Sequence, residues 1–526
     1  MNGYQNERQN KFFSNLLFIY LYVLLLRKKR EEVIILLLAT YSKEGDMLSL
    51  STYYDKNSYG TYHFEYEANG NIVSVTDPNG MKSSFTYHTD PRFVNTVSVT
   101  GNGCDTYTSE FEWEFGRELK KSETDSNHNT MRYAYDTQGR LKEVWTPEDR
   151  DSPAVSYEYH IGDDGVWYSI TSNKTMYDRS VSHSNPVIQT VAASDGLGRV
   201  KWTAKTGCVS DGGTGTQGGW NVSGLVTYDS NGRTKASGMV QFSRANSVEA
   251  LLRDDKILVN PSYTDYDAKG RTVRSVMPKD SEGNAPESTT DYLITDGVLQ
   301  TTATDPLGNR TVQVSDARGN IIYLEKQDSR GEKLTSVNYS YDVIGQMLEA
   351  YNEDPAKPIR VTYDLAGRML TLASADSGEK HFFYDEAGNK VREDDSLLRS
   401  KGQQIKYEYD GMNRLVRIDY PESVDTIYEY GGANAGDNGA GKIIKTTDST
   451  GTIEYKYGSL GEVVEETRSI YRMSANDGDG TSITATMKYT SDYLGRMQEI
   501  TYPDGEVVTY GYDEGGQVNR VSGVRG

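Results

Sequence analysis

A short unit recurs along this chain: an apolar residue, Tyr-x-Tyr-Asp, two variable residues, Gly, and then Arg or Asn. It is clearest at residues 337–345, 361–368, 382–389 and 405–414. Alternating apolar and polar residues are typical of a half-buried β-strand. The Asp predicts a tight turn in which its side chain accepts a backbone N–H bond, and the Gly predicts the left-handed residue that closes the turn. Each unit therefore predicts one antiparallel β-hairpin.

Three positions of the unit are the candidate structural sites: the Tyr before the turn, the Asp that opens it and the Gly that closes it. The Tyr rings are predicted to form a structural ladder along the sheet, because they stand at a fixed place before each turn. The Arg that often follows the Gly is predicted to pair with an acidic residue across the hairpin. The predicted turn residues are Tyr135, Asp136, Gly139, Tyr228, Asp229, Gly232, Tyr266, Asp267, Gly270, Tyr341, Asp342, Gly345, Tyr363, Asp364, Gly367, Tyr384, Asp385, Gly388, Tyr409, Asp410, Tyr512 and Asp513.

Composition supports an all-β fold. The chain has 40 Tyr against 11 Phe, together with 51 Gly, which favours many short strands and tight turns. One stretch predicts a helix, with Asn246 as its cap, Glu249 at the capping-box position, and Val248, Leu251 and Leu252 on its apolar side. The predicted architecture is a spiralling sheet of antiparallel hairpins that forms a shell or part of one.

The density of repeats divides the chain into four segments. They are a hydrophobic and basic leader at 1–40, degenerate repeats at 41–160, an irregular Gly- and Ser-rich insertion with some repeats at 161–261, and dense repeats at 262–526.

The leader has two apolar runs, 12–26 and 33–39, separated by a charged stretch. Neither run reaches the roughly 20 residues of a membrane-spanning helix. A signal peptide carries its basic residues before its apolar run, whereas here the larger basic cluster follows it. Three interpretations stay open: an atypical export signal or anchor, a membrane-surface hairpin, or an incorrectly assigned start. Membrane contact is expected only through residues 12–39.

The formal net charge of −20 argues against a nucleic-acid partner, because phosphate binding needs clustered Lys and Arg. Cys104 and Cys208 give neither a disulfide framework nor a metal-ligand spacing, and the sequence leaves open whether they pair. The Gly213-x-Gly215-x-x-Gly218 pattern is not followed by a helix start, as a dinucleotide site requires, and is interpreted as a loop.

Candidate catalytic and metal-binding groups do not form a set. The stretch 476–480 lacks the bidentate Glu that completes a calcium loop, and the six His residues are scattered without a ligand spacing. Turn chemistry accounts for the many Asp residues. The sequence therefore predicts no cofactor, no metal and no enzymatic activity.

The stretches 194–200 and 266–273 resemble the YD-repeat, or Rhs-repeat, family, and in particular the repeats of toxin-complex B components. The resemblance covers roughly residues 50 to 526 with gaps. It implies a long β-ribbon that spirals into a hollow shell around a polypeptide.

The expected function is a non-enzymatic shell or scaffold component of a secreted polymorphic toxin or toxin complex. The expected partner is a polypeptide cargo, or a second chain that completes the shell, because the chain ends within a repeat near Tyr512 and leaves an open sheet edge. The alternative is a cell-surface recognition or adhesion protein that binds carbohydrate, such as cell-surface glycans, or protein. Both interpretations place the protein outside the cell or at its surface.

Overall fold

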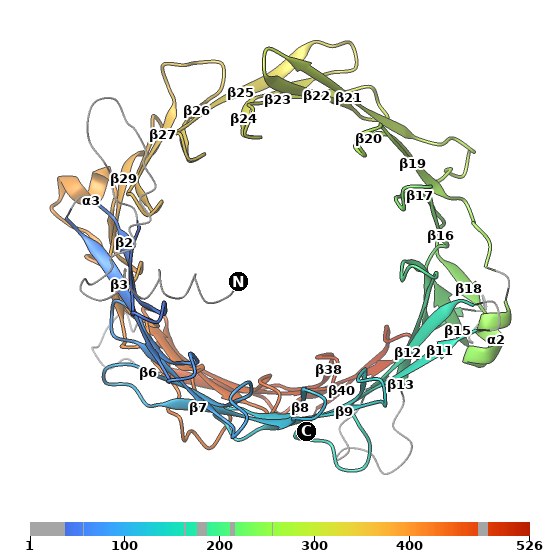
Figure 1. Cartoon of the computed structure of the whole chain (residues 1–526), viewed down its shortest axis with the longest axis horizontal. Coiled ribbons are helices and arrows are strands. Elements are labelled where there is room, and N and C mark those ends of the chain that lie inside the picture. Colours follow the sequence, from blue (N-terminus) through green and yellow to red (C-terminus); the bar gives the residue numbers. More distant parts are fainter. Residues whose placement is uncertain are drawn as a thin grey trace, which may run out of the picture.

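The chain is a succession of antiparallel strands that runs round a ring (Figure 1). The computed structural model describes residues 37–525, apart from 56, 163–164, 176–186, 211–215, 255 and 472–481. Within these ranges it has two short helices, α2 (Val248–Arg253) and α3 (Ser396–Ser400). The prediction of an all-β chain of repeated hairpins is confirmed.

The first sheet has 16 strands, and each strand pairs with its sequence neighbour until β15, which pairs with β18. Its strands are β1 (Leu37–Tyr41), β2 (Met47–Tyr53), β3 (Tyr59–Tyr66), β4 (Ile72–Thr76), β5 (Lys82–Tyr87), β6 (Val94–Thr100), β7 (Tyr107–Glu114), β8 (Leu119–Thr124), β9 (Thr130–Tyr135), β10 (Leu141–Trp145), β11 (Val155–Ile161), β12 (Trp167–Lys174), β13 (Val187–Ser194), β14 (Val200–Ser210), β15 (Thr216–Val222) and β18 (Gln241–Ser243).

The second sheet has 24 strands, which follow the sequence after β17 has paired with β19. Its strands are β16 (Val226–Tyr228), β17 (Thr234–Ser237), β19 (Ser262–Tyr266), β20 (Thr272–Val276), β21 (Glu287–Thr295), β22 (Val298–Thr304), β23 (Arg310–Ser315), β24 (Ile321–Gln327), β25 (Lys333–Tyr341), β26 (Met347–Tyr351), β27 (Ile359–Tyr363), β28 (Met369–Ser374), β29 (Gly378–Tyr384), β30 (Lys390–Asp394), β31 (Ile405–Tyr409), β32 (Leu415–Asp419), β33 (Thr426–Tyr430), β34 (Ile443–Asp448), β35 (Gly451–Tyr457), β36 (Val463–Tyr471), β37 (Ser482–Ser491), β38 (Met497–Thr501), β39 (Val507–Tyr512) and β40 (Val518–Val524).

Two glycines meet where the sheets part, between β15 and β16. A Cβ atom on Gly224 would lie 1.5 Å from the carbonyl oxygen of Gly238. The backbone N–H of Gly238 donates a 3.0 Å hydrogen bond to the carbonyl of Leu225. This close approach of two backbone segments requires glycine at position 224.

The wall is one sheet thick over most of its length, so side chains alternate between half-buried and exposed positions. In β31, Ile405, Tyr407 and Tyr409 are half-buried, whereas Lys406 and Glu408 are exposed. This alternation confirms the two predicted faces of the strand.

Among the residues that the structure describes, a conventional hydrophobic core forms where α2 lies against the first sheet (Figure 1). Leu251 of the helix is fully buried there. Its buried neighbours in the cluster come from β12 to β15 and are Ile170, Val191, Ala193, Trp202, Ala204, Trp220 and Val222. The irregular segment thus holds the thickest part of the wall.

Both helices differ from the expectation in one respect. The cap of α2 is Ser247, whose hydroxyl accepts a 3.2 Å bond from the N–H of Ala250, so the prediction of Asn246 as the cap is wrong by one residue. Helix α3 was not predicted. It begins after Asp395, whose carboxylate accepts a 2.8 Å bond from the N–H of Leu398.

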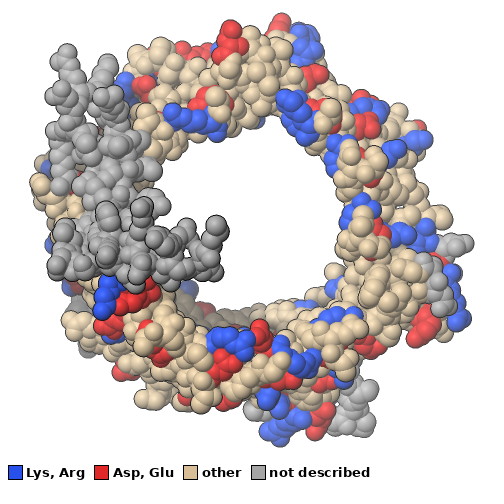
Figure 2. Space-filling view, viewed as in Figure 1, with Lys and Arg blue, Asp and Glu red and all other residues tan. Residues whose placement is uncertain are grey.

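The ring closes as a spiral. Strands β1 to β15 run along the left and bottom of the ring in Figure 1 and are here called the first spiral turn, and β16 to β26 complete the circuit along the right and top. Strands β27 to β40, here called the second spiral turn, then pass along the left and bottom again and overlap β1 to β15. Hydrogen bonds between residues 305 to 347 positions apart join the two spiral turns. Figure 2 shows the opening that the wall encloses.

The four-segment division stays a prediction. Strand β1 (Leu37–Tyr41) lies partly in the stretch assigned to the leader, and the rest of that leader lies outside the described residues. Strands β12 to β18 carry the irregular segment as part of the two sheets. No helix in the described part of the chain is long and apolar enough to span a membrane.

Candidate functional site

The turn that opens at Asp364 shows how one repeat unit is closed. The N–H of Asp364 donates a 2.9 Å bond to the carbonyl of Arg368, and the N–H of Gly367 donates a 3.1 Å bond to the carbonyl of Asp364. Gly367 has a φ of 86°, in the left-handed region that favours glycine. One carboxylate oxygen of Asp364 accepts from the N–H of Arg368 at 2.9 Å, and the other accepts from its guanidinium Nε at 2.6 Å.

The other predicted turns have the same backbone geometry. In one of them the left-handed residue is Asn and not Gly. A register shift precedes the turn in each hairpin, for example at Thr362/Tyr363. The predicted glycines have positive φ angles: Gly139 (85°), Gly232 (79°), Gly270 (83°), Gly345 (90°) and Gly388 (97°). In the turn of Asp410, Asn413 takes the left-handed place with a φ of 58°. In the turn of Asp513 that place belongs to Gly516, with a φ of 82°.

Where the unit carries an Arg, it pairs with the turn Asp, which faces it across the mouth of the hairpin, so the expected acidic partner is the Asp that opens the same turn. The guanidinium follows the Asp by four residues and reaches back to the carboxylate oxygen that the backbone leaves free. Such pairs join Arg140 to Asp136, Arg199 to Asp195, Arg233 to Asp229, Arg271 to Asp267, Arg368 to Asp364, Arg414 to Asp410 and Arg496 to Asp492.

The same Arg also stacks on an aromatic ring of the following hairpin. That ring belongs to the Tyr directly before the hairpin's own turn. Arg414 lies 4.4 Å from the centre of the Tyr430 ring. The Tyr430 hydroxyl donates a 3.0 Å bond to the carbonyl of Leu415, the residue directly after that Arg. Hydroxyl bonds of this kind also join Tyr135 to Lys120, Tyr159 to Leu141, Tyr228 to Val200, Tyr266 to Thr234, Tyr292 to Thr272, Tyr341 to Ile321, Tyr384 to Met369, Tyr409 to Lys390 and Tyr512 to Met497.

These contacts set the charge states of the unit. Burial raises the pKa of Tyr384, Tyr409 and Tyr430, so each hydroxyl stays a donor. At Asp410 burial favours the neutral acid, but hydrogen bonds from Arg414 and from two backbone N–H groups outweigh it and lower the pKa. The unit is therefore a polar clamp between consecutive hairpins.

A second set of contacts, here called the seam, joins the two spiral turns. The strands of the second spiral turn are joined by turns at both ends. Between Asp364 and Asp513, every turn at the end that carries these two Asp residues contacts a loop of the first spiral turn. The contacts join Leu365 to Tyr54, Asp385 to Asn79, Asn413 to Asp77, Gly431 to Tyr107, Asn438 to Asn129, Ala440 to Asn127, Ser459 to Glu148, Tyr493 to Asp149 and Asp513 to Cys208.

The centre of one seam contact is the amide of Asn79. Its Nδ2 donates 2.8 Å bonds to Asp385 and to the side-chain oxygen of Asn413. That oxygen also accepts a 2.9 Å bond from Nδ2 of Asn389, and the Asn413 amide donates to Asp77. Two loops of one spiral turn and one loop of the other are thus held by amide donors, with carboxylate and amide oxygens as acceptors.

Another seam contact is centred on Asp149, whose side chain is fully buried. Lys174, 3% exposed, lies 3.1 Å from it, and the Tyr493 hydroxyl donates a 2.6 Å bond to the same oxygen. The other oxygen accepts from the N–H of Thr146 at 2.7 Å and of Ala154 at 3.1 Å. Because every lone pair is used, this buried ion pair is structural in character.

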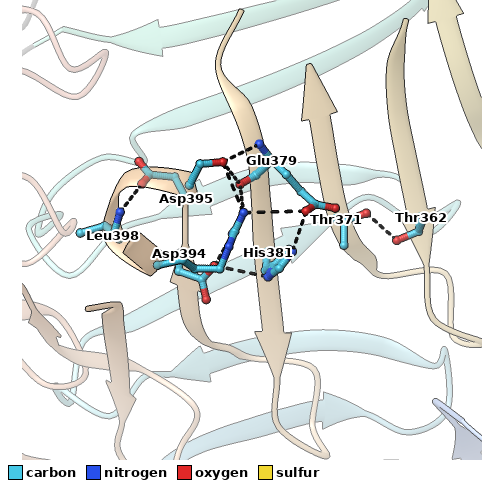
Figure 3. Close-up of polar contacts among 9 residues, drawn as sticks. Thr362, Thr371, Glu379, His381, Asp394, Asp395 and Leu398 are labelled. Carbon is cyan, nitrogen blue, oxygen red and sulfur yellow. Dashed lines mark hydrogen bonds and ion pairs between the residues drawn. The ribbon is translucent and has the colours of Figure 1, made fainter. Parts of the chain in front are cut away.

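A histidine beside α3 is the arrangement that comes nearest to catalytic chemistry (Figure 3). His381 Nε2 lies 3.3 Å from Glu379, and Nδ1 lies 3.4 Å from Asp394. Arg399 pairs with Asp394 at 2.5 Å. The Ser396 hydroxyl bonds the backbone of Glu379 and not the imidazole, so it is not an activated nucleophile.

The remaining sequence candidates do not come together in the described structure. Cys104 and Cys208 are free thiols. Gly218 lies in β15, whereas Gly213, Gly215, His183 and the stretch 476–480 lie outside the described residues. Among the residues that the structure describes, no group of three or more His, Cys, Asp or Glu residues could hold a metal ion.

Sequence reasoning found the turns but missed the seam. Asn79, Lys174 and Tyr493 carry no local pattern that marks them, because their partners are more than 300 residues away or belong to irregular loops. The one local signal is Asn413, which stands where other units have Gly.

Hairpins tied by this clamp and wound into a closed spiral define the class of repeat-built β-shells, and the comparisons with known proteins agree. Residues 53–183 match the Teneurin YD-shell family, and residues 492–526 match the RHS repeat family. These matches confirm the resemblance to YD- and Rhs-repeat proteins.

Two curated proteins are similar to parts of the chain. "Toxin protein Tse5" of Pseudomonas aeruginosa is 24% identical over 192 residues, which is 33% of this chain and 14% of that protein. "Double-stranded DNA deaminase toxin A" of Burkholderia cenocepacia is 25% identical over 219 residues, which is 39% of this chain and 14% of that protein. The chain thus spans a small part of the length of these relatives.

The fold matches solved structures of a toxin complex over nearly the whole chain. The crystal structure of TcdB2-TccC3 aligns with a TM-score of 0.75 at 17% identity, covering 92% of this chain and 29% of that one. The crystal structure of TcdB2-TccC3-Cdc42 aligns with a TM-score of 0.72 at 16% identity, covering 91% and 29%. This confirms the shell fold.

Proposed function

We propose that the chain is a non-enzymatic wall segment of a YD/Rhs-repeat shell that belongs to an exported toxin or toxin complex and encloses a polypeptide. The observation that carries the proposal is the seam. Contacts along its whole length convert a ribbon of hairpins into a closed wall around an opening (Figure 2). A wall of this kind separates a polypeptide inside it from proteases outside.

The toxin names of the two curated relatives and the shell fold of the toxin-complex structures support this proposal. The absence of a nucleophile bonded to His381 argues for a scaffold role of the α3 site. The expected partner is an enclosed polypeptide or a further chain that extends the wall.

The proposal can be tested by protease protection. An unfolded, trypsin-sensitive reporter polypeptide is joined after Gly526, and its half-life in trypsin is compared with that of the free reporter. A wall around the reporter should lengthen its half-life by at least about tenfold while the chain itself stays intact. Equal half-lives in the presence of an intact chain would contradict enclosure.

A second measurement addresses the scaffold role separately. His381→Ala removes the imidazole between Glu379 and Asp394. Protection of the fused reporter should be the same in this variant as in the wild type. A reporter that is cleaved by the wild-type chain without added protease, but not by the His381→Ala chain, would show that the α3 site is an enzyme.

A further inference from the structure

The five seam turns that open with Asp in the repeat pattern fall into two chemical kinds, distinguished by the fifth residue counted from that Asp. In the turns of Asp364, Asp410 and Asp492 this residue is Arg. The guanidinium occupies the outer carboxylate oxygen of the Asp, with Nε 2.6 to 2.7 Å away. The contacts of these turns with the first spiral turn come from other groups: the N–H of Leu365, the amide of Asn413 and the hydroxyl of Tyr493.

In the two turns of the other kind the fifth residue is an amide. Asn389 follows Asp385, and Gln517 follows Asp513. Here the outer oxygen of the Asp itself reaches across the seam. Asp385 accepts the 2.8 Å bond from Asn79, and Asp513 accepts a 2.9 Å bond from the Cys208 thiol.

The physical reason is competition for one oxygen. A guanidinium presents two N–H groups to the outer oxygen, as Arg414 does to Asp410 with Nε and Nη2 each at 2.7 Å, and its bonds are charge-assisted. The outer oxygen of Asp492 accepts a further 3.1 Å bond from Gln498 of its own hairpin, so it too stays within that hairpin. Asn389 gives Asp385 one neutral 2.9 Å bond and leaves a lone pair for Asn79. When the fifth residue is Arg, the outer oxygen of the Asp is therefore bound within its own hairpin. When the fifth residue is an amide, this oxygen can accept a hydrogen bond from the neighbouring spiral turn.

We infer that the fifth residue of each repeat turn decides whether its Asp serves its own hairpin or the next spiral turn, and that Asn389 and Gln517 fix the register of the seam in this way. Gln517 is a positioning residue, since it acts through Asp513. Asn389 acts through Asp385 and also donates a 2.9 Å bond to the side-chain oxygen of Asn413 within the seam. The inference concerns closure of the wall and stands whether or not the wall encloses a polypeptide.

The Cys208 thiol gives a direct readout. Its hydrogen bond to Asp513, together with burial and the nearby charge, raises its pKa to about 11. In a Gln517→Arg variant the guanidinium should take the outer oxygen of Asp513, so that the thiol loses the neighbour that raises its pKa. Alkylation of Cys208 by iodoacetamide at pH 8, followed by peptide mass spectrometry on the full chain, should then accelerate by at least about tenfold.

Three controls make the result specific. Gln517→Asn keeps an amide and should keep the slow wild-type rate. Gln346→Arg makes the same change in the turn of Asp342, for which the described structure shows no contact with another spiral turn, and should leave Cys208 unchanged. Cys104, in the same chain, should react at its wild-type rate throughout.

A matching variant tests the other amide turn without relying on a thiol. Asn389→Arg should speed amide exchange in residues 77–82 of the first spiral turn by about tenfold, while exchange in β21 and β22 stays the same. The inference is overturned if Gln517→Arg leaves the Cys208 rate unchanged, if Cys104 accelerates equally, or if Asn389→Arg leaves residues 77–82 as protected as in the wild type.

Discussion

The Tyr384 hydroxyl donates a 3.0 Å hydrogen bond to the carbonyl of Met369, and Arg368, the residue before Met369, lies 4.8 Å from the centre of the Tyr384 ring. One tyrosine is thus held by both the backbone and the charged side chain of the preceding hairpin. Since Arg368 is itself bound to Asp364, the contacts of the Tyr in one repeat depend on the turn of the preceding repeat. This dependence explains why Tyr, Asp and Arg recur together in the sequence.

Removing this hydroxyl should loosen the joint between two hairpins. Tyr384→Phe leaves the carbonyl of Met369 without its partner, and the lost bond should cost about 0.5–1.5 kcal/mol of local stability. Hydrogen exchange of β28 and β29 measures the change. Tyr263→Phe is the matched control, because Tyr263 is 44% exposed and should tolerate the loss of its hydroxyl. Equal effects of the two changes would contradict the clamp.

The left-handed residue of a turn should accept Asn better than a β-branched residue. Gly367 has a φ of 86°, and Asn413 occupies the same place in its own turn with a φ of 58°. Gly367→Val should therefore destabilise the hairpin by roughly 1–3 kcal/mol, and Gly367→Asn by clearly less. Thermal unfolding followed by local hydrogen exchange separates the two. A Val variant as stable as the Asn variant would rule out the proposed turn strain.

The buried ion pair of the seam should be intolerant of losing one partner. Lys174→Met leaves the fully buried Asp149 carboxylate without its cation, which should cost about 3–5 kcal/mol. Lys43→Met, in a pair whose Lys side chain is 81% exposed, should be nearly neutral. Denaturant unfolding compares the two variants. A nearly neutral Lys174→Met would show that the pair does not hold the seam.

Acid should destabilise the repeat turns by protonating the carboxylate of the turn Asp. The pKa of Asp410 is lowered in the folded chain, so this group binds its proton more weakly in the folded state than in the unfolded state. Its contribution to stability is then present above its unfolded pKa of roughly 3.9 and is lost as the pH falls through the folded value.

The corresponding measurement is exchange in β31 and β32 between pH 6 and pH 2, corrected for the intrinsic rate. The wild-type hairpin should lose protection at the acid end of this range, whereas Asp410→Asn should start less stable and change less with pH. A variant with the same acid dependence as the wild type would assign the effect to other groups.

The hairpins were predictable because their determinants are local. Tyr409, Asp410 and Arg414 lie within six positions of one another, and their bonds follow from turn geometry. The acidic partner of Arg414 was predictable in kind, and the structure shows that it is Asp410 of the same turn.

The seam was not predictable for the opposite reason. Asn79 and Asp385 lie 306 positions apart, and the rise of the spiral that brings them together is the sum of many small twists between strands. The helix α3 escaped notice because it is five residues long. Its start signal, Asp395 before Ser396, is also a common turn pattern.

Two spiral turns of one chain lie against each other along the seam. The Asn129 amide donates a 3.0 Å bond to the side-chain oxygen of Asn438, 309 positions away. A chain carrying Asn129→Cys and Asn438→Cys should therefore form an intramolecular disulfide under mild oxidation, identified by peptide mass spectrometry. The Asn129→Cys/Asn320→Cys chain should not form one. Failure of the first pair to join within one chain, or equal joining of the control pair, would contradict the closed spiral.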